Sequence, residues 1–185
     1  MPLLDARTEL KLSQALLKGW IGSGLNSLDL PLRLLRFPLG RLQKGTLAHF
    51  ELDKDFCALV VQFVSGPALR MKIQVLGYLP ATQVLRLRIE QLQFSGFRGA
   101  PVLNLIPGRV LEMLCTQANQ RLPGLLEAGK NMEISLHLVP LLQKVLQEIP
   151  LEGLRRSGLE IHPEVRVEHL ELSEKQLWLT FSASG

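Results

Sequence analysis

The sequence predicts an α+β fold in which a long, curved, mainly antiparallel sheet packs on two or three amphipathic helices. Many short segments alternate apolar with polar residues, which is typical of strands with one buried face. Other segments carry apolar residues at helical spacing. The chain has 185 residues, of which 46% are hydrophobic and 21% charged. That length and composition are sufficient to bury the core of a single domain.

Three amphipathic helices are expected. The first spans residues 8–21, where bulky apolar side chains recur every four residues and either Asp5 or Thr8 could cap the helix. The second spans 108–122 and begins after a proline, which is favoured in the first turn of a helix. The third spans 140–148 and lies between two prolines.

Alternating or continuous apolar runs predict the strands. A proline-flanked run over 28–37 indicates an edge strand or an extended crossover. The next strands follow one another closely, which predicts an antiparallel meander, and the strand over 46–52 is expected to bury Ala48, Phe50 and Leu52. The further strands are expected at 56–64, 69–75, 85–94, 132–138, 159–161, 165–172 and 177–183.

Two of these strands change phase part-way along. The apolar side chains move from odd to even positions at Glu90-Gln91 in one strand. The same change occurs at Glu168-His169 in the other. A β-bulge adds one residue to a strand, so a bulge at each point would return all the apolar side chains to one face.

The two phase-changing strands also resemble each other. The eight residues that begin at Arg88 and the eight that begin at Arg166 align at an offset of 78, with four identical. The chain is expected to form one domain over 1–185. Within it, either the halves 1–100 and 101–185 share a duplicated strand, or bulged amphipathic strands are simply alike.

The charge is unevenly distributed. The net charge is +4, but residues 1–100 carry 13 basic and 7 acidic side chains, whereas 101–185 carry 8 and 10. A local basic cluster consists of Arg33, Arg36, Arg41 and Lys44. Because no recognised binding motif accompanies it, nucleic acid is not an expected partner.

No catalytic or metal-binding signature is visible, so we expect neither an enzyme nor a cofactor. Cys57 and Cys115 each stand alone and are interpreted as small buried hydrophobic residues. The four histidines are scattered rather than set at metal-ligand spacing. They are His49, His137, His162 and His169.

Membrane insertion is not expected either. The longest stretch without a charged residue is 56–69, and a membrane span needs roughly 18 to 20 apolar residues. The first residues do not form a basic segment leading into an apolar one, as a secretory signal would. A cytoplasmic or peripheral membrane protein is therefore expected, unless a signal has been trimmed from the chain.

The order of the expected elements resembles that of the tubular lipid-binding (TULIP-like) superfamily and its small bacterial single-domain relatives. The resemblance rests on a helix, a long meander, an amphipathic helix and further bulged strands that read Arg-[Ile/Val]-Glu-x-Leu. It implies a strongly curved sheet that wraps a long helix and leaves an aliphatic groove for acyl chains. This family binds through generic apolar lining, so no individual site residue carries over.

The residues themselves favour non-catalytic binding of a lipid or another hydrophobic ligand in such a groove. The 42 leucines, against one tyrosine and two tryptophans, would give an adaptable aliphatic lining. The alternative is a structural or protein-interaction domain whose core is filled. The oligomeric state stays open. The expected lining residues are Leu69, Met71, Ile73, Leu85, Leu87, Ile89, Val110, Leu111, Leu114 and Ala118. The opposite face of the same strands could contact an anionic membrane surface through Arg70, Lys72, Arg86 and Arg88.

Overall fold

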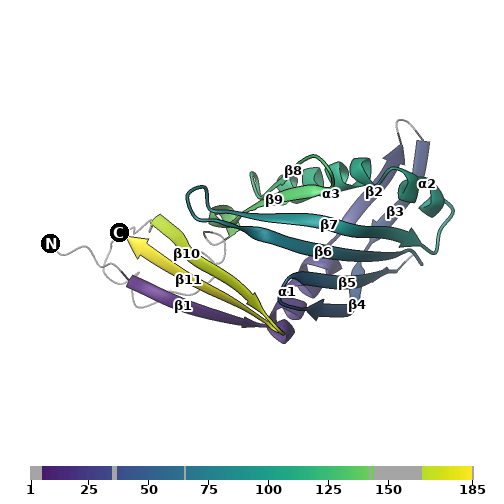
Figure 1. Ribbon diagram of the computed structural model, residues 1–185. Helices are drawn as coiled ribbons and strands as arrows, with labels where there is room; N and C mark the ends of the chain where they lie inside the picture. The colour runs from purple at the N-terminus through teal and green to yellow at the C-terminus, as the bar shows by residue number, and fades with distance from the viewer. Residues whose placement is uncertain (1–5, 35–36, 65, 142, 144–163, 185) are drawn as a thin grey trace, which may run out of the picture.

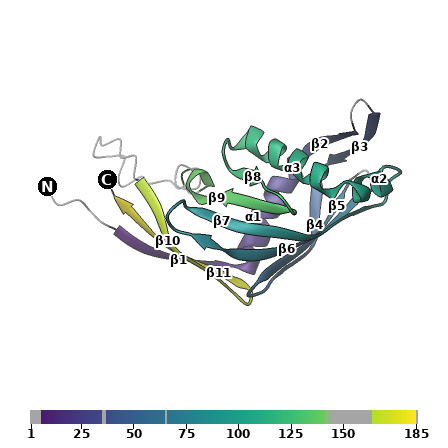
Figure 2. The same ribbon diagram turned by 45° about the horizontal axis from the view of Figure 1, so that its top comes forward.

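The computed structural model describes residues 6–34, 37–64, 66–141, 143 and 164–184, and the fold is α+β as the sequence predicts. Figure 1 shows a large sheet in the middle, a small sheet at one end and a two-stranded ribbon at the other. Helices lie against one side of the large sheet, as Figure 2 shows for α3. The predicted strand at 159–161 lies outside the described residues.

The large sheet has six strands in the order β4-β5-β6-β7-β9-β8, and every neighbouring pair is antiparallel. The first four strands form the predicted meander. β9 reaches the sheet only after two helices and pairs with the first five residues of β7. The strands are β4 (Gly45–Leu52), β5 (Phe56–Phe63), β6 (Ala68–Leu79), β7 (Val84–Ser95), β8 (Leu126–Ala128) and β9 (Glu133–His137).

The small sheet joins the two ends of the chain in the order β1-β11-β10. It consists of β1 (Ala6–Ser13), β10 (Glu164–Ser173) and β11 (Gln176–Ser184). The ribbon consists of β2 (Asp29–Leu34) and β3 (Phe37–Gln43). Pro31 and Pro38 lie in this ribbon, and a two-stranded ribbon has only edge strands. Of the two alternatives for 28–37, the edge strand is therefore confirmed for β2, whereas β3, which begins at Phe37, was not expected.

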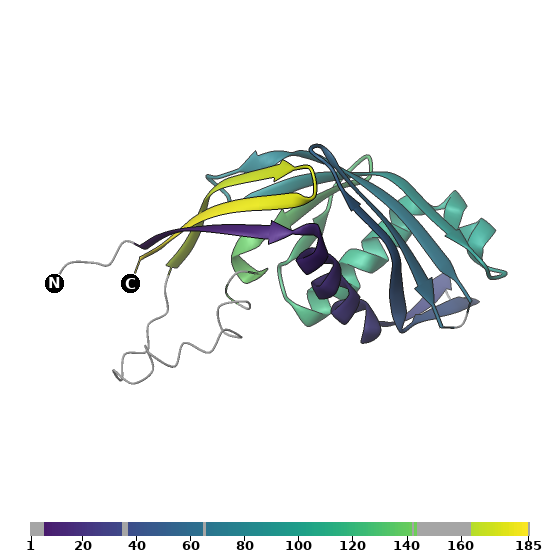
Figure 3. The ribbon, with the colours of Figure 1, turned by 90° about the horizontal axis from the view of Figure 1, so that it is seen from below.

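Three helices occupy the inner side of the curved sheet or its end. They are α1 (Gln14–Asn26), α2 (Ala100–Leu105) and α3 (Pro107–Arg121). Figure 3 shows α1 and α3 on the same, inner side. The predicted helix at 108–122 is confirmed as α3, and α2 was not expected. Helical backbone is also present at residues 138–141, and most of the predicted helix at 140–148 lies outside the described residues.

The prediction of a helix over 8–21 is wrong in its first half, because β1 occupies residues 6–13. β1 pairs with β11 over eight residues at the other end of the chain, and local spacing cannot reveal such a partner. The helix begins only at Gln14, where the Leu16 N–H donates a hydrogen bond to the Oγ of the N-cap residue Ser13 at 3.3 Å. Of the two expected caps, Thr8 lies within β1 and Asp5 lies outside the described residues.

Both predicted bulges are confirmed. Lys72 pairs with Gln91 and Ile73 with Ile89, so Glu90 is the extra residue in β7. In β10 the register shifts between Val167 and His169, which leaves Glu168 as the extra residue. The two extra residues are separated by the same offset of 78 as the aligned strands.

Two further bulges in the large sheet were not predicted. One lies at Ala48 in β4, where the register shifts between Leu47 and His49. Ala48 is consequently exposed and Leu47 buried, so the expectation that Ala48 shares the buried face of Phe50 is wrong. The other lies at Leu76 in β6, between Val75 and Gly77. Each bulge bends its strand and increases the local twist.

Three hydrophobic cores hold these layers together. The end core joins the ribbon, β4, β5, α2 and α3, and it includes Leu30, Leu32, Leu42, Leu47, Phe50, Val61, Phe63, Leu69, Leu103 and Val110. The junction core connects the small sheet to β7 and consists of Leu12, Leu85, Leu138, Val167 and Leu179. The central core lies between α3 and the large sheet and consists of Ile89, Leu111, Cys115 and Ile134.

Four side-chain amides close the edges of the sheets. Each donates to a backbone carbonyl and accepts from a backbone N–H, as a neighbouring strand would. Gln14 bonds the Phe50 carbonyl and the Leu52 N–H on β4. Each of the other three amides bonds the N–H and the C=O of a single residue: Gln83 bonds Val167 on β10, Asn104 bonds Phe94 on β7, and Asn119 bonds Leu126 on β8. In this way α1, α2 and α3, together with the β6-β7 turn, are fixed to strand edges.

Candidate functional site

The expected groove residues lie on the inner side of the sheet and on α3, but they are divided among the cores. Nine of the ten pack into the three cores, and Ala118 is half-buried on α3. The central core brings together Ile89 and Leu111 with the half-buried Met71, Ile73 and Leu87. Leu69, Val110 and Leu114 pack in the end core instead, and Leu85 packs in the junction core.

The inner face at the centre of β6 is incompletely covered, and so are some of the residues that pair with it, Cys57, Leu87 and Leu92. Met71, Ile73 and Val75 are successive apolar residues that pack toward the cores, yet all three are only half-buried. Val61 on the neighbouring β5 is 1% exposed, and Ile89 on β7 is 4% exposed. The middle of the sheet therefore keeps aliphatic surface that α3 does not fully cover.

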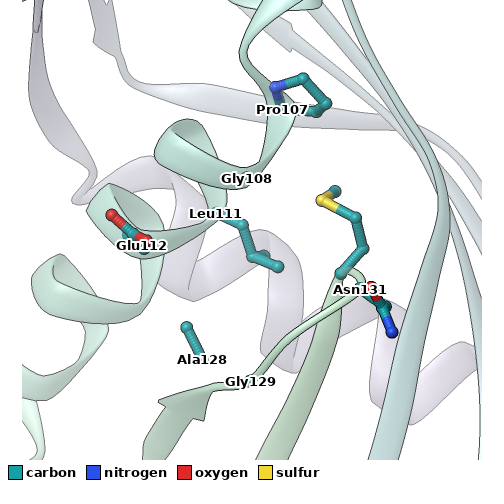
Figure 4. Close-up of a pocket in the computed structure, with 8 residues that line it drawn as sticks. Pro107, Gly108, Leu111, Glu112, Ala128, Gly129 and Asn131 are labelled. Carbon is teal, nitrogen blue, oxygen red and sulfur yellow. The ribbon is translucent and has the colours of Figure 1, made fainter.

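A depression of about 310 Å³ opens between the first turns of α3 and the β8-β9 turn. Its lining residues are Pro107, Gly108, Leu111, Glu112, Ala128, Gly129, Asn131 and Met132. Figure 4 shows Leu111 projecting from α3 toward the β8-β9 turn, while Glu112 lies on another side of the helix. Leu111 also belongs to the central core, so the depression borders that aliphatic layer, although its lining includes no residue of β6 or β7. Its volume lies at the small end of the range typical of ligand sites, roughly 300 to 1,000 Å³.

Local backbone geometry shapes this opening. Ile106 leaves the helical region at φ −126° and ψ 50°, which separates α2 from α3 and lets Pro107 start the new helix. Across the opening, Asn131 and Met132 have φ values of 54° and 62°, in the left-handed region. Two consecutive residues in that region make the β8-β9 turn tight, which places Met132 at the rim.

A second depression of about 330 Å³ lies on the other flank of α3, against the ribbon. It is lined by Leu30, Pro31, Glu112, Met113, Thr116 and Gln117. Glu112 borders both depressions, and its carboxylate accepts a hydrogen bond from Arg109 at 3.1 Å on the exposed side of the helix. None of the ten expected groove residues lines this second depression.

The basic residues on the outer face are largely paired. Arg86 and Arg88 both donate to the carboxylate of Glu133, at 2.9 and 2.8 Å. The hydrogen bonds from Arg88 and then from Arg86 hold the pKa of Glu133 below its usual value. Lys72 lies 2.8 Å from Glu90, and Arg70 is exposed. The outer face therefore carries a small positive excess rather than four free cations.

The cysteines are not arranged as nucleophiles. Burial raises the pKa of the Cys57 thiol to about 11, and burial also raises the pKa of Cys115. An activated thiol shows the opposite change, because a nearby cation stabilises its thiolate. Cys115 is buried in the central core and Cys57 is half-buried beside the end core, which agrees with their interpretation as small hydrophobic residues.

The described part of the chain brings no three His, Cys, Asp or Glu side chains together as a metal ion would need. Three histidines each lie near one exposed glutamate, and the fourth, His162, lies outside the described residues. The pairs are His49 with Glu51, His137 with Glu127 and His169 with Glu171. In the basic cluster, Arg41 is bound to Asp29 by two hydrogen bonds of 2.6 Å.

No protein-family model, curated protein or solved structure matches this chain. Among the described residues, no helix is both long and apolar enough to cross a membrane. The opening at α3 is therefore interpreted from its geometry alone. Sequence reasoning identified one wall of it, Leu111, but missed Ala128 because the three-residue β8 gives too little alternation to detect. It assigned Met132 to the strand predicted over 132–138, whereas Met132 lies in the β8-β9 turn.

Proposed function

We propose that this protein binds a lipid or another hydrophobic ligand, without catalysis, in the aliphatic layer between α3 and the large sheet. The observation that carries the proposal is the incomplete cover over Met71, Ile73 and Val75 at the centre of β6. The ligand enters through the depression beside Leu111 and Met132. An acyl chain then replaces water on the half-buried side chains beneath the helix.

The chemistry of the lining supports a hydrocarbon ligand. The central core and the residues packed on it are aliphatic or sulfur-containing, and side chains of this kind adapt to a flexible chain better than to a shaped polar metabolite. Each CH₂ group removed from water contributes roughly 0.8 kcal/mol. The bulges at Glu90 and Leu76 bend the two longest strands over α3, which favours a hollow rather than a flat layer.

Contact with an anionic membrane surface is a second part of the proposal. Arg70, Arg86 and Arg88 lie on the outer face, and Arg86 and Arg88 form ion pairs with the same carboxylate, that of Glu133. Their small positive excess would attract anionic headgroups weakly, by about 1 kcal/mol per unpaired cation near the surface. The attraction is expected to fall with added salt.

A protein-interaction or structural domain is the alternative function, and one observation favours it. The end core is filled, with Leu32, Leu42 and Val110 each 0% exposed, and both depressions are shallow. If α3 settles onto β6 in solution, the central layer is also filled and no ligand binds. The experiment below separates these functions.

The test compares two adjacent residues of β6 that face opposite sides. Met71→Glu places a charge in the aliphatic layer and is expected to abolish uptake of a fluorescent fatty acid. Arg70→Glu on the outer face is expected to leave uptake intact but to weaken binding to vesicles that contain anionic phospholipid. Leu87→Glu should behave like Met71→Glu. Native mass spectrometry of the protein purified from cells should show added acyl-chain masses for wild type and Arg70→Glu only.

An uncharged pair of variants keeps the test valid if a buried glutamate unfolds the domain. Ala128→Trp fills the opening beside Leu111 without adding charge, and Thr116→Trp adds the same ring to the second depression. Uptake should slow strongly in Ala128→Trp and stay unchanged in Thr116→Trp. Equal uptake by wild type and by cooperatively folded Met71→Glu, or a clean apo mass with no uptake by wild type, would overturn the proposal in favour of the filled-core domain.

A further inference from the structure

The sheet edges differ in how they are closed. The edges formed by β4, β7, β8 and β10 are each bonded by a side-chain amide, from Gln14, Asn104, Asn119 and Gln83. The ribbon carries Pro31 and Pro38, which discourage strand addition. Within the described part of the chain, no side chain or backbone group bonds the outer edge of β1.

β1 carries charged side chains, which can protect an edge strand, but it lacks the backbone features that do so. Its eight residues pair with β11 without a register shift, and they include no proline, glycine or bulge. Alternate residues of an antiparallel edge strand direct their N–H and C=O groups away from the sheet. With respect to the described residues, β1 therefore presents a regular row of unpaired donors and acceptors, which a further strand could pair.

We propose that β1 pairs with β1 of a second copy of this chain, antiparallel about a two-fold axis at Leu10. A two-fold axis perpendicular to a sheet places one residue opposite its own copy. Centring it at Leu10 puts Glu9 opposite the partner's Lys11 and repeats that pair on the other side of the axis. Centring it at Glu9 instead puts two glutamates face to face, and centring it at Lys11 opposes two lysines. Opposite charges in directly facing positions stabilise strand pairing and like charges oppose it.

The two charged side chains lie on one face of the small sheet, two residues apart in β1. Glu9 and Lys11 are both exposed, and Glu9 has no ion-pair partner among the described residues. Lys11 Nζ lies 3.8 Å from the centre of the Trp178 ring, which holds the ammonium group on the face of the small sheet that Glu9 shares. The proposed dimer thus has a continuous six-stranded sheet in the order β10-β11-β1-β1-β11-β10. An edge-to-edge interface is small, so the dimer is expected to dissociate on dilution.

Sedimentation velocity over a range of protein concentrations tests the pairing, and it requires no ligand, so its outcome is separate from that of the lipid proposal. Glu9→Lys is expected to raise the dimer dissociation constant by about tenfold or more, because two attractive pairs become repulsive. Lys11→Glu should do the same. The double variant Glu9→Lys/Lys11→Glu restores both pairs and should dimerise like wild type. A wild type that stays monomeric at every concentration, or a double variant as weak as the singles, would overturn the proposal.

Disulfide trapping tests the register without changing charge. Residues that face each other across an antiparallel pair have Cα atoms about 4.5 to 5.5 Å apart, within the range of a disulfide. Leu10→Cys is therefore expected to form a covalent dimer under mild oxidation, and Thr8→Cys and Ser13→Cys are not. The variants are made in a Cys57→Ala/Cys115→Ala background. Preferential trapping through Thr8→Cys would refute the Leu10-centred register.

Discussion

The two ends of the inner layer differ in how completely the same kind of side chain is covered. At the end near the ribbon, Leu103 and Val61 are each 1% exposed. At the centre of β6, Met71 and Ile73 come from equally regular alternation but are only half-buried. The difference lies in the covering elements. The ribbon, α1, α2 and part of α3 all pack on the first region. Met71 and Ile73 instead lie where the end core meets the central core, and both are covered incompletely.

An apolar pattern is often taken to show both which face of a strand turns inward and how completely that face is buried, but these are separate properties. Alternation fixes which face of a strand turns inward, because successive side chains point to opposite faces. It does not fix how much of that face another element covers. A filled core and a ligand site can therefore have the same pattern, and the covering helices decide between them.

The largest expected effect comes from truncating one side chain in each region. Leu103→Ala creates a cavity in the filled end core and should lower the free energy of unfolding by about 2 to 5 kcal/mol. Met71→Ala removes a half-buried side chain and should cost about half as much or less. Urea denaturation with an unchanged m-value measures both. Equal losses would mean that the centre of β6 is as filled as the end core.

The next effect concerns the amides at either end of the open centre. The N–H of the buried Val167 donates a hydrogen bond to Gln83 Oε1, with 2.6 Å between the nitrogen and the oxygen. Gln83→Met preserves the length of the side chain but removes this acceptor. Asn104→Leu likewise removes the acceptor of the Phe94 N–H near the end core. Each should cost about 1 to 3 kcal/mol, because a buried donor loses its partner. Hydrogen exchange should accelerate in β10 only for Gln83→Met, and faster exchange in β10 for both variants would contradict separate roles.

The sequence was informative where a signal is local. The meander, α3 and both bulges at Glu90 and Glu168 followed from changes in alternation within a few residues. The bulge at Ala48 was missed because alanine fits either face of a strand. For the site, the pattern placed Leu111 and Ile89 correctly on the inner layer, which the central core confirms.

Other features depend on contacts between distant segments. The apolar stripe that predicted the first helix has only Leu12 in β1, so the helix was extended too far toward the N-terminus. The partner of β1, β11, begins more than 160 residues later, and no local pattern could identify that pairing. The edge-closing amides are single glutamines and asparagines whose role exists only after folding. Whether α3 covers β6 depends on the position of the whole helix, which no residue of β6 encodes.

A smaller effect is the loss of stability at alkaline pH that is expected from Cys57, which packs beside the end core. The pKa of Cys57 is raised by burial from 9.0 to about 11, so the folded state keeps its proton where the unfolded state loses it. This contribution to stability is present below pH 9 and should be lost between pH 9 and pH 11, by about 2 kcal/mol. The loss is measured as the difference between the pH profiles of wild type and Cys57→Val. Parallel profiles would mean that this thiol is solvated.

The smallest expected effect concerns Glu133, which holds β9 against β7 behind the opening. Its carboxylate accepts hydrogen bonds from Arg88 and Arg86, so its pKa should lie below the ordinary value of 4.5. A carboxyl group with a lowered pKa stabilises the fold above that ordinary value, and the contribution is lost as the pH falls through the lower one. NMR titration of the Glu133 carboxyl carbon measures the midpoint.

The two arginines provide matched controls for that titration. Arg88→Gln should raise the midpoint more than Arg86→Gln, because the hydrogen bond from Arg88 makes the larger contribution. Since Glu133 directly follows Met132 at the rim of the opening, Glu133→Gln should loosen the β8-β9 turn and speed fatty-acid exchange while changing global stability little. Unchanged exchange in that variant would show that the rim is held by the left-handed turn alone, so that the ion pairs on the outer face and the opening on the inner face act independently.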